Sequence, residues 1–272
     1  MGAVARAGAG SVPGTGPGAG SDDHAAWTTC LDRLSADPFY AQYKSRASVL
    51  LDARVTGRYL EVGCGLGDDA IALASASRGC VIGLDRSRDM VRDARRRGLT
   101  HAAAGDVHAL PFAQGAFDGC RADRVLQHVR DPRSAVAEMA RVTRPGGRIV
   151  TIDPDYDTQV LAIRDRALAR RILRYRCDQM LRNGALAHHV AGLFVSAGLR
   201  EVMVETRTLV ARDLQGAAGA LDLRSWAEHA RRRGHATAAD VAAWADDLDN
   251  AVRKGTFLYA VTFFITSGSA SA

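Results

Sequence analysis

The 272-residue sequence has few of the features that mark membrane, disulfide-rich or zinc-binding proteins. Its five cysteines are scattered, odd in number and never spaced as Cys-x-x-Cys, which argues against a disulfide framework or a zinc site. No apolar run approaches the roughly 20 residues that a membrane span needs. The longest run, Phe257 to Ile265, has the length of a strand. We therefore expect no metal and no membrane contact.

Lysine is also nearly absent. Only Lys44 and Lys254 occur, so the net charge of +6 comes almost entirely from arginine, in a chain rich in alanine and glycine. A basic balance can indicate a nucleic-acid partner. The arginine clusters 95–97 and 231–233 are short, however, and are typical of solvated helix ends. The charge pattern therefore disfavours nucleic acid as a partner.

The first 22 residues are dominated by glycine, alanine and proline and hold no continuous apolar stretch. They do not resemble a secretory signal, and Arg6 stands where a myristoylation motif requires serine or threonine. We expect a disordered tail over 1–22, then N-terminal cap helices over 23–53 with a break at Asp37-Pro38. We also expect the protein to be cytoplasmic.

Short apolar runs alternate with amphipathic segments in the first half of the chain. We expect strands at 58–62, 81–84, 100–104, 117–122 and 148–153, and helices at 68–75, 88–97 and 132–142. This alternation predicts βαβ units and an α/β fold with a Rossmann-like, doubly wound sheet that occupies 54–272.

The second half of the chain is richer in helical patterns. We expect helices at 160–182, 185–196, 213–233 and 237–253, and strands at 201–210 and 256–266. The expected strands number seven in all. Two helical insertions, near 160–183 and 212–234, lie where such a fold builds a cap over its substrate.

The strongest local signal is a strand that runs into three glycines and then a helix, Tyr59-Leu-Glu-Val-Gly63-Cys-Gly65-Leu-Gly67-Asp68-Asp69. Glycines let the backbone turn tightly and approach a ligand closely. The pattern lacks the third glycine of a dinucleotide site, and Asp68 and Asp69 would compete with a pyrophosphate for the helix N-terminus. With Glu61, these acids favour a cationic ligand such as S-adenosylmethionine (SAM), which carries a sulfonium and an ammonium group.

Two further acids follow the next two strands. Asp85 comes 18 residues after Gly67, close to the spacing at which an acid meets ribose hydroxyls in Rossmann-like sites. It also suits a helix start, because Ser87 and a helix follow. Asp106 lies on the turn after 100–104, where a carboxylate can accept a hydrogen bond from an adenine amino group.

Several motifs occur together in one order. They are Leu-Glu-Val-Gly-Cys-Gly-x-Gly, Gly-Leu-Asp-x-Ser-x-x-Met, Gly-Asp-x-x-x-Leu-Pro-Phe, Phe117-Asp118, Val125-Leu-Gln-His-Val129 and Arg141-Val-x-Arg-Pro-Gly-Gly147. The sequence resembles the class I SAM-dependent methyltransferases, in particular the group similar to the ubiquinone/menaquinone-biosynthesis enzymes. The resemblance is strong over roughly 57–153, moderate over Phe39 to Leu51, and only topological over 160–253.

The resemblance implies a seven-stranded sheet whose last strand is antiparallel, and SAM as the cofactor. It also implies a set of cofactor contacts. The methionine portion would be wrapped by Gly63, Gly65 and Gly67 together with Glu61, and Arg121 would contact it through its backbone. Asp85 would bind the ribose, Arg86 and Met90 would pack near the adenosine, and Asp106 and Val107 would hold the adenine. Tyr43 and Arg46 would close over the cofactor.

The reaction of this family is an in-line displacement, to which an enzyme contributes mainly alignment. A base helps when the nucleophile starts protonated, and histidine is the commonest choice. His128, after the fourth strand, is our candidate base, with bracing of its loop as the alternative role. Asp153, Asp155 and Tyr156 follow the fifth strand, and we expect them to line the substrate pocket, although Asp-Pro-Asp is also turn chemistry.

The sequence thus predicts transfer of a methyl group to an N, O or C nucleophile of a small organic molecule, such as a specialised metabolite of antibiotic biosynthesis. The segment Arg121-Ala-Asp-Arg124 differs from the Asn/Asp-Pro-Pro-Tyr of many DNA adenine methyltransferases. The remaining alternatives are an RNA methyltransferase, an NAD-dependent oxidoreductase, and a SAM-binding protein of this fold with other chemistry.

Overall fold

The computed structural model describes residues 21–53, 56–77, 79–215 and 221–271. The predicted tail lies outside the described residues, except that residues 21 and 22 already belong to the first helix. The elements in the first half of the chain are α1 (Ser21–Ser35), α2 (Pro38–Leu50), β1 (Arg58–Val62), α3 (Asp68–Ser77), β2 (Cys80–Asp85), α4 (Arg88–Arg96), β3 (His101–Ala104), β4 (Phe117–Asp123) and α5 (Pro132–Val142).

The second half continues with longer strands and short helices. These elements are β5 (Thr143–Leu161), α6 (Arg166–Tyr175), the π-helix η1 (Arg176–Met180), the 3₁₀ turn η2 (Ala187–His189), α7 (Val190–Ser196), β6 (Arg200–Ala211), the 3₁₀ turn η3 (Leu223–Ser225), α9 (Trp226–Arg232), α10 (Ala238–Arg253) and β7 (Tyr259–Ser269).

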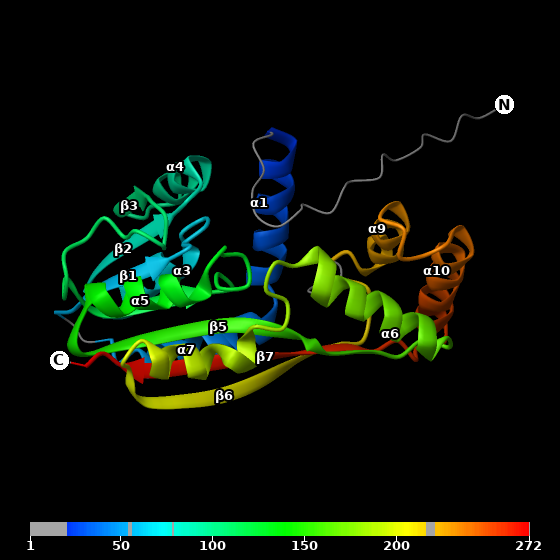
Figure 1. Cartoon of the computed structure of the whole chain (residues 1–272). Helices are drawn as coiled ribbons and strands as arrows, with labels where there is room; N and C mark the ends of the chain where they lie inside the picture. The colour runs from blue at the N-terminus through cyan, green and yellow to red at the C-terminus, as the bar shows by residue number, and fades with distance from the viewer. Residues whose placement is uncertain (1–20, 54–55, 78, 216–220, 272) are drawn as a thin grey trace.

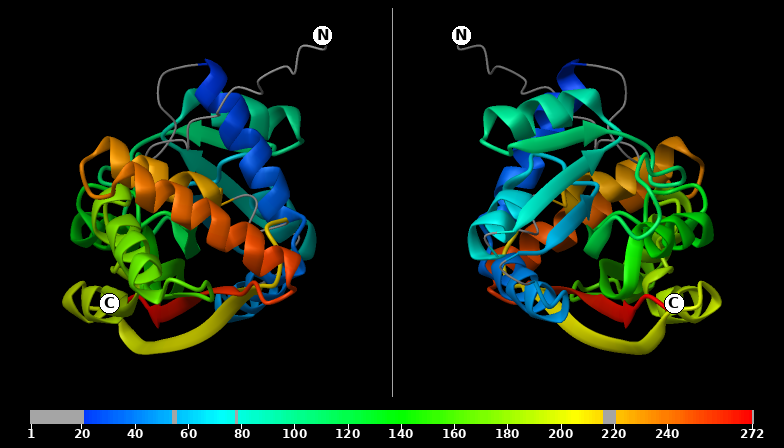
Figure 2. Two further views of the ribbon diagram at one scale, coloured as in Figure 1. Left: turned by 90° about the vertical axis from the view of Figure 1, so that its right-hand side faces the viewer. Right: turned by 90° about the vertical axis from the view of Figure 1, so that its left-hand side faces the viewer.

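One seven-stranded sheet has the order β3-β2-β1-β4-β5-β7-β6. The pairs from β3 to β5 are parallel, whereas β7 runs antiparallel to both β5 and β6. Figure 2 shows β6 along one edge of the twisted sheet. The predicted doubly wound, Rossmann-like sheet with an antiparallel last strand is therefore confirmed.

Side chains that alternate along the strands supply two cores, one on each face of the sheet. On β5, Ile149 packs into one core and Val150 and Ile152 pack into the other. The first core includes residues of α5 and α7, and the second includes residues of α2, α3, α6, α9 and α10. Burial of both faces explains why the parallel strands read as continuous apolar runs in the sequence.

The starts of α2 and α5 are fixed by capping, which is local chemistry. Asp37 precedes Pro38, and its side chain accepts a hydrogen bond from the backbone N–H of Phe39. Asp131 likewise precedes Pro132 and accepts hydrogen bonds from two backbone amides at the start of α5. Proline at the first helical position lacks only an N–H group that the helix would leave unpaired.

Strand β5 is much longer than the predicted 148–153. Beyond Asp153 it continues to pair with β7, with Pro154 opposite Phe263, and the register then shifts between Asp155 and Val160. On its other side, β4 pairs with β5 only as far as Ile152. Pro154 therefore lies where β5 has no β4 neighbour, so its missing N–H costs no hydrogen bond of that ladder.

Three predicted helices of the second half are shorter than expected. The helix predicted from 160 begins at Arg166, because β5 extends to Leu161 and Asp165 caps the helix. The helix predicted from 185 begins at Val190, after a 3₁₀ turn. The segment predicted as helical over 213–233 is interrupted at Asp222, whose backbone is left-handed (φ 49°); its residues 216–220 lie outside the described residues.

Helices α6, α9 and α10 gather at one end of the molecule, beside the far end of β5, and α6 contacts both of the others (Figure 1). Helix α1 stands between this group and α4 (Figure 1). Over the part of the chain that the structure describes, no helix combines the length and apolarity needed to cross a membrane.

Candidate functional site

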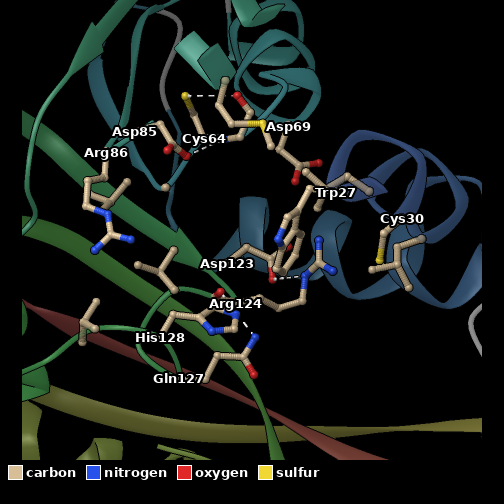
Figure 3. Close-up of a pocket in the computed structure, with 18 of the residues that line it drawn as sticks. Trp27, Cys30, Cys64, Asp69, Asp85, Arg86, Asp123, Arg124, Gln127 and His128 are labelled. Carbon is tan, nitrogen blue, oxygen red and sulfur yellow. Dashed lines mark hydrogen bonds and ion pairs between the residues drawn. The ribbon is translucent and has the colours of Figure 1, made fainter. Parts of the chain in front are cut away.

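The main pocket opens at the carboxyl ends of β1, β2 and β4, where ligands bind in open α/β sheets. Its volume is about 430 Å³, within the range of small-molecule sites. Helices α1 and α2, the segment from β5 to α9, and β7 supply further walls. Figure 3 shows side chains from the N-terminal helices and from the loops after β1, β2 and β4 converging on this pocket.

The glycine turn after β1 forms one end of the pocket. Gly63, Gly65 and Gly67 all have left-handed backbone conformations, with φ of 66°, 51° and 85°. A Cβ added to Gly63 would lie 2.4 Å from Cγ2 of Val125, and one added to Gly67 would lie 2.8 Å from Cβ of Ala94. The turn therefore requires glycine for both conformation and space.

Asp85 holds this turn against the next strand. Its Oδ2 accepts a hydrogen bond from the Gly65 N–H at 2.9 Å, and its Oδ1 accepts one from the Ser87 N–H at 2.8 Å. Burial raises the pKa of Asp85, whereas these backbone hydrogen bonds oppose the rise. The side chain reaches toward the glycine turn, as Figure 3 shows. A carboxylate has further lone pairs, so Asp85 can also accept ligand hydroxyls.

The wall beyond Asp85 carries the other residues predicted for the adenosine side. Met90 and Val107 are buried, and Arg86 and Asp106 line the pocket with them. The Nδ1 atom of His108 pairs with Asp106, and the backbone N–H of His108 adds a hydrogen bond at 2.9 Å that lowers the pKa of Asp106. Asp106 is therefore a fixed anionic acceptor at this end of the pocket.

Glu61 lines the pocket, but Arg121, which we expected to contact the methionine end of the cofactor through its backbone, does not. The Arg121 Nε atom lies 2.7 Å from the Glu61 Oε2 atom, and both side chains are almost fully buried. The guanidinium also donates to Ser48 and to the backbone carbonyl of Asp69. Arg121 lies outside the pocket lining and ties together β1, β4, α2 and α3. Burial raises the pKa of Glu61 to about 7, against the opposing charge of Arg121.

Helix α2 presents a different face to the pocket from the one expected. Tyr43 is fully buried and donates its hydroxyl hydrogen to Asp123, and Arg46 is paired with Glu205 on β6. Neither residue lines the pocket. Tyr40 and Lys44, one helical turn apart, line it instead. At about 100° per residue, Lys44 and Arg46 lie on opposite sides of α2, so the face that turns Tyr40 and Lys44 toward the pocket points the Arg46 side chain away from it.

Helix α1 covers the pocket with apolar side chains and is attached by ion pairs. Trp27, Leu31 and Leu34 line the cavity. The Arg97 guanidinium on α4 lies 2.8 Å from Oδ1 of Asp32 on α1. His24 on α1 similarly lies 2.7 Å from Asp93 on α4. Exposed pairs of this kind contribute little energy each, so α1 is held mainly by its apolar face.

Comparison with known proteins now adds to this geometry. Residues 60–151 match a family model described as a methyltransferase domain. A 37.1 kDa protein in transposon TN4556 of Streptomyces fradiae is 39% identical over 247 residues, covering 89% of this chain and 70% of that protein. A demethylmenaquinone methyltransferase of Renibacterium salmoninarum is 39% identical over 102 residues. The chain belongs to the class I SAM-dependent methyltransferases.

The similarity to the other relatives is partial. The alignment with the Renibacterium enzyme covers 37% of this chain and 43% of that protein, so the chain spans less than half of its length. Among solved structures, the YcgJ protein of Bacillus subtilis aligns with a TM-score of 0.59 at 20% identity, covering 85% of this chain and 99% of that one. This likeness shows the methyltransferase fold alone.

SAM is the cofactor of this methyltransferase family, and the donor set of the pocket suits it. The glycine turn offers close backbone approach, which an added Cβ at Gly63 would block. Asp85 and Asp106 are held by backbone N–H groups and keep further lone pairs, so they can accept hydrogen bonds of the kind that ribose hydroxyls and an adenine amino group donate. Asp69, which is paired with Lys44 at 2.8 Å, and Glu61, which is paired with Arg121, place carboxylate oxygens near the turn, and such oxygens suit a sulfonium and an ammonium group.

The loop after β4 forms the other end of the methyltransferase pocket. Arg124 follows the strand with a left-handed backbone (φ 57°), and its N–H donates to the Ile152 carbonyl at 2.6 Å. A non-glycine residue in this conformation is uncommon and concentrates at functional sites. The Arg124 Nε atom lies 3.7 Å from Asp123, and its guanidinium lies over the Tyr40 ring, 5.1 Å from the centroid.

His128, the predicted base, lines this end of the pocket. The Trp27 ring meets it edge to face at 6.2 Å. Burial, together with the positive charges of Arg124 and Arg176, lowers the pKa of His128 to about 4. The imidazole is therefore neutral at physiological pH, which leaves a lone pair to accept a hydrogen bond but makes it a weak base in the protein alone.

The structure brings only Tyr156 of the three predicted substrate residues into the pocket. Asp153 is buried behind the lining, where its Oδ1 accepts the backbone N–H of Gln127 at 3.2 Å. Asp155 is also fully buried, accepts the His188 backbone N–H at 3.0 Å and pairs with the His188 ring. Both aspartates brace the loops that surround the pocket, because β5 continues as a strand through these residues.

Two arginines were missed as pocket residues. Arg124 lies only three residues beyond Arg121. Because of the chain direction at the end of β4, the Arg124 side chain lines the pocket and the Arg121 side chain does not. Arg176 is contributed by the π-helix η1, a geometry that local sequence patterns do not reveal. The only sequence signal for Arg124 was its place after a strand that ends at the ligand-binding edge of the sheet.

Proposed function

We propose that this methyltransferase transfers a methyl group from SAM to an N, O or C nucleophile of a small organic molecule, a specialised metabolite. The observation that carries the proposal is the two-ended pocket. One end is built from the glycine turn, Asp85 and Asp106, and the other from Arg124, His128 and Tyr156. A single cavity of about 430 Å³ that joins both ends can hold a methyl donor and a small acceptor in contact.

The enclosure of the pocket supports a small acceptor. Helix α1 covers one side, and we propose that α6, η1 and α9 form the substrate cap on the other. Relatives named demethylmenaquinone methyltransferase and O-methyltransferase favour a small organic acceptor as well. An RNA strand would require an open, positively charged groove, whereas this pocket is covered by the apolar side chains of Trp27, Leu31 and Leu34.

The residues of the chain act mainly by positioning. SAM supplies a methyl group carried on a positively charged sulfur atom. The Gly63 turn and Asp85 fix the cofactor end, and the apolar side chains of Trp27 and Leu31 exclude water from it. Tyr156 and Arg124 hold the acceptor end. Alignment of nucleophile and methyl group by such fixed walls is the principal source of rate enhancement in this reaction.

We propose that His128 orients or deprotonates the acceptor nucleophile. Its pKa of about 4 favours the neutral ring, so it can accept a hydrogen bond from a hydroxyl or amine. An anionic substrate beside Arg124 and Arg176 would neutralise the charges that lower this pKa and strengthen the base. We expect His128→Ala to lower turnover with little change in SAM affinity, and unchanged turnover would remove His128 from the mechanism.

The experiment that tests the proposal is methyl transfer from radiolabelled SAM to a fractionated cell extract of small molecules and, separately, to total RNA. We expect label in an organic-soluble or small-molecule product that depends on the protein. Label confined to RNA would favour the RNA methyltransferase alternative. Binding of SAM without transfer to either fraction would favour a SAM-binding protein with other chemistry.

A further inference from the structure

Arg176 is a buried cation in the wall of the pocket. It is the first residue of η1, and only 6% of its surface is exposed. The centre of its guanidinium lies 4.1 Å from the Trp226 ring centroid and 4.9 Å from the Tyr156 ring centroid. The guanidinium thus contacts both rings and also forms a side-chain hydrogen bond with Tyr156. Single π-helical turns are frequent at functional sites.

The charge of Arg176 is not neutralised as that of the other buried arginine is. Arg121 is paired with Glu61 at 2.7 Å. Within the described residues, by contrast, Arg176 forms no ion pair with a carboxylate. Asp155, the buried acid nearest in sequence on β5, is already engaged by His188. An unpaired buried charge is costly, which points to a ligand that supplies the missing negative charge.

Unsatisfied buried atoms gather around Arg176 at this end of the pocket. Across the described chain, the buried side-chain atoms without a hydrogen-bond partner include five that belong to pocket-lining residues, namely Trp27 Nε1, Arg124 Nε, Gln127 Oε1, His128 Nδ1 and Arg176 Nε. Buried polar groups normally have partners. Three of these five atoms are N–H donors, two of them on guanidinium groups, and only Gln127 Oε1 is purely an acceptor, so the group that satisfies most of them carries acceptor oxygens.

The rest of the lining at this end is apolar. Leu209, Leu221, Val261 and Phe263 face the same cavity as Tyr156. A ligand that fits must therefore combine an apolar or aromatic body with one compact acceptor group. The fork of an arginine binds a carboxylate with two parallel hydrogen bonds.

We propose that the methyl acceptor is an apolar or aromatic organic acid whose carboxylate is bound by Arg176, with Arg124 beside it. This inference rests on the proposed function and specifies the substrate class of the same pocket. A single carboxylate matches the charge of the one unpaired guanidinium, whereas a doubly charged phosphate would exceed the positive charge left by Arg176 and by Arg124, which Asp123 partly neutralises.

The first test compares matched probes on wild-type protein saturated with S-adenosylhomocysteine (SAH). The probes are 2-naphthoate, its neutral amide 2-naphthamide, and 2-naphthyl phosphate, each titrated by calorimetry. We expect the carboxylate to bind at least tenfold more tightly than the amide, the scale of a charge-assisted hydrogen bond. Equal affinities would overturn the proposal, and tightest binding of the phosphate would replace the carboxylate with a phosphate ester.

The second test uses variants on the same helical segment. Arg176→Gln should abolish the preference for 2-naphthoate over the amide, whereas Arg174→Gln, whose side chain is 83% exposed and paired with Asp178, should keep it. SAH affinity should stay within about twofold in both variants. Arg176→Lys serves as a second variant that keeps the charge and should retain part of the preference.

Two outcomes separate this inference from the proposed function. If Arg176→Gln weakens SAH as much as 2-naphthoate, then Arg176 binds the carboxylate of the cofactor itself, and the substrate assignment is wrong. If wild-type protein fails to bind SAH, the proposed function fails, whatever the probes do. Normal SAH binding without acid selectivity overturns only the assignment of an acidic substrate.

Discussion

The two ends of the pocket are built on opposite principles. At the end formed by β1 and β2, the acids Asp85 and Asp106 are held by backbone amides, and Glu61 is paired with Arg121. At the end formed by β4 and η1, the cations and His128 retain unsatisfied buried atoms. The first arrangement is complete within the protein and suits one fixed cofactor. In the second arrangement, buried polar groups have no partner within the described protein, so the substrate supplies the partners, as expected of a site that defines specificity.

The largest predicted effect is that of pH on the free energy of unfolding, through His128 at the substrate end of the pocket. His128 has a pKa of about 4 in the folded protein, below the ordinary 6.5, so between these values the unfolded chain binds a proton that the folded protein does not. The free energy of unfolding should therefore fall as the pH is lowered from about 6.5 to 4, by up to about 3 kcal/mol. Denaturant titration of wild type and His128→Gln across this interval measures the difference.

The comparison of variants is needed because Glu61 acts in the opposite sense. Its raised pKa, about 7, lets the folded protein bind a proton before the unfolded chain does as the pH falls. The contribution of Glu61 is common to both proteins and cancels in the difference. Equal pH dependence in wild type and His128→Gln would show that the ring is not held neutral by burial and the neighbouring arginines.

The second-largest effect should be a loss of cofactor affinity in Gly63→Ala, at the glycine-turn end of the pocket. The added Cβ would meet Val125 at 2.4 Å in a backbone conformation that side chains disfavour. We expect SAH affinity to fall at least thirtyfold, about 2 kcal/mol. Gly192→Ala on α7, where an added Cβ meets nothing within 4 Å, is the matched control and should leave the affinity unchanged. Equal affinities of the two variants would mean that the ligand does not depend on this turn.

Asp85→Ala should weaken SAM binding at least tenfold, about 1.4 kcal/mol, because it removes a ligand acceptor and the tie to Gly65. Asp89→Ala, on the exposed face of α4, is the control, since Asp89 pairs with the neighbouring exposed Arg92. Affinity should be measured by calorimetry after circular dichroism has shown that both variants are folded. Unchanged affinity in a folded Asp85→Ala protein would refute the ribose assignment.

The attachment of α1 should have the smallest effect. Arg97→Gln removes the contacts of α4 with Asp32 and Asp68, so α1 should cover the pocket less tightly. We expect SAH affinity to fall three- to fivefold, which is under about 1 kcal/mol. Arg92→Gln, on the same helix but paired with Asp89, is the control. A loss of a hundredfold or more would show that the ion pairs, rather than the apolar face, hold α1.

The glycine turn and the acids after β2 and β3 line the pocket, as the sequence predicted, because their signals are local. The bounds of β1 and α5 agree with the structure, since a glycine turn ends the first and Asp131-Pro132 begins the second. Gly63, Asp85 and their neighbours lie where the strand-turn-helix pattern places them. In the family, the same local geometry meets the same cofactor, so a short motif is enough to identify the site.

Residues that long-range contacts position were predicted less well. The alternative of a turn at Asp153-Pro154-Asp155 was wrong, because pairing with β7 keeps this segment in a strand. Tyr43 and Arg46, which we expected to close over the cofactor, lie outside the pocket lining, because the orientation of α2 depends on packing against Phe263 and on Glu205, which are distant in sequence. Arg176 enters the pocket only through a π-helical turn. None of these contacts leaves a periodic signal near the residue concerned.

The central claim, that the glycine-turn end of the pocket is a SAM site, is tested most directly by calorimetric titration of the purified protein with SAH. The structure predicts binding of one molecule per chain with micromolar or tighter affinity. Absence of binding by a folded sample, at protein concentrations that would detect a millimolar complex, would contradict the claim.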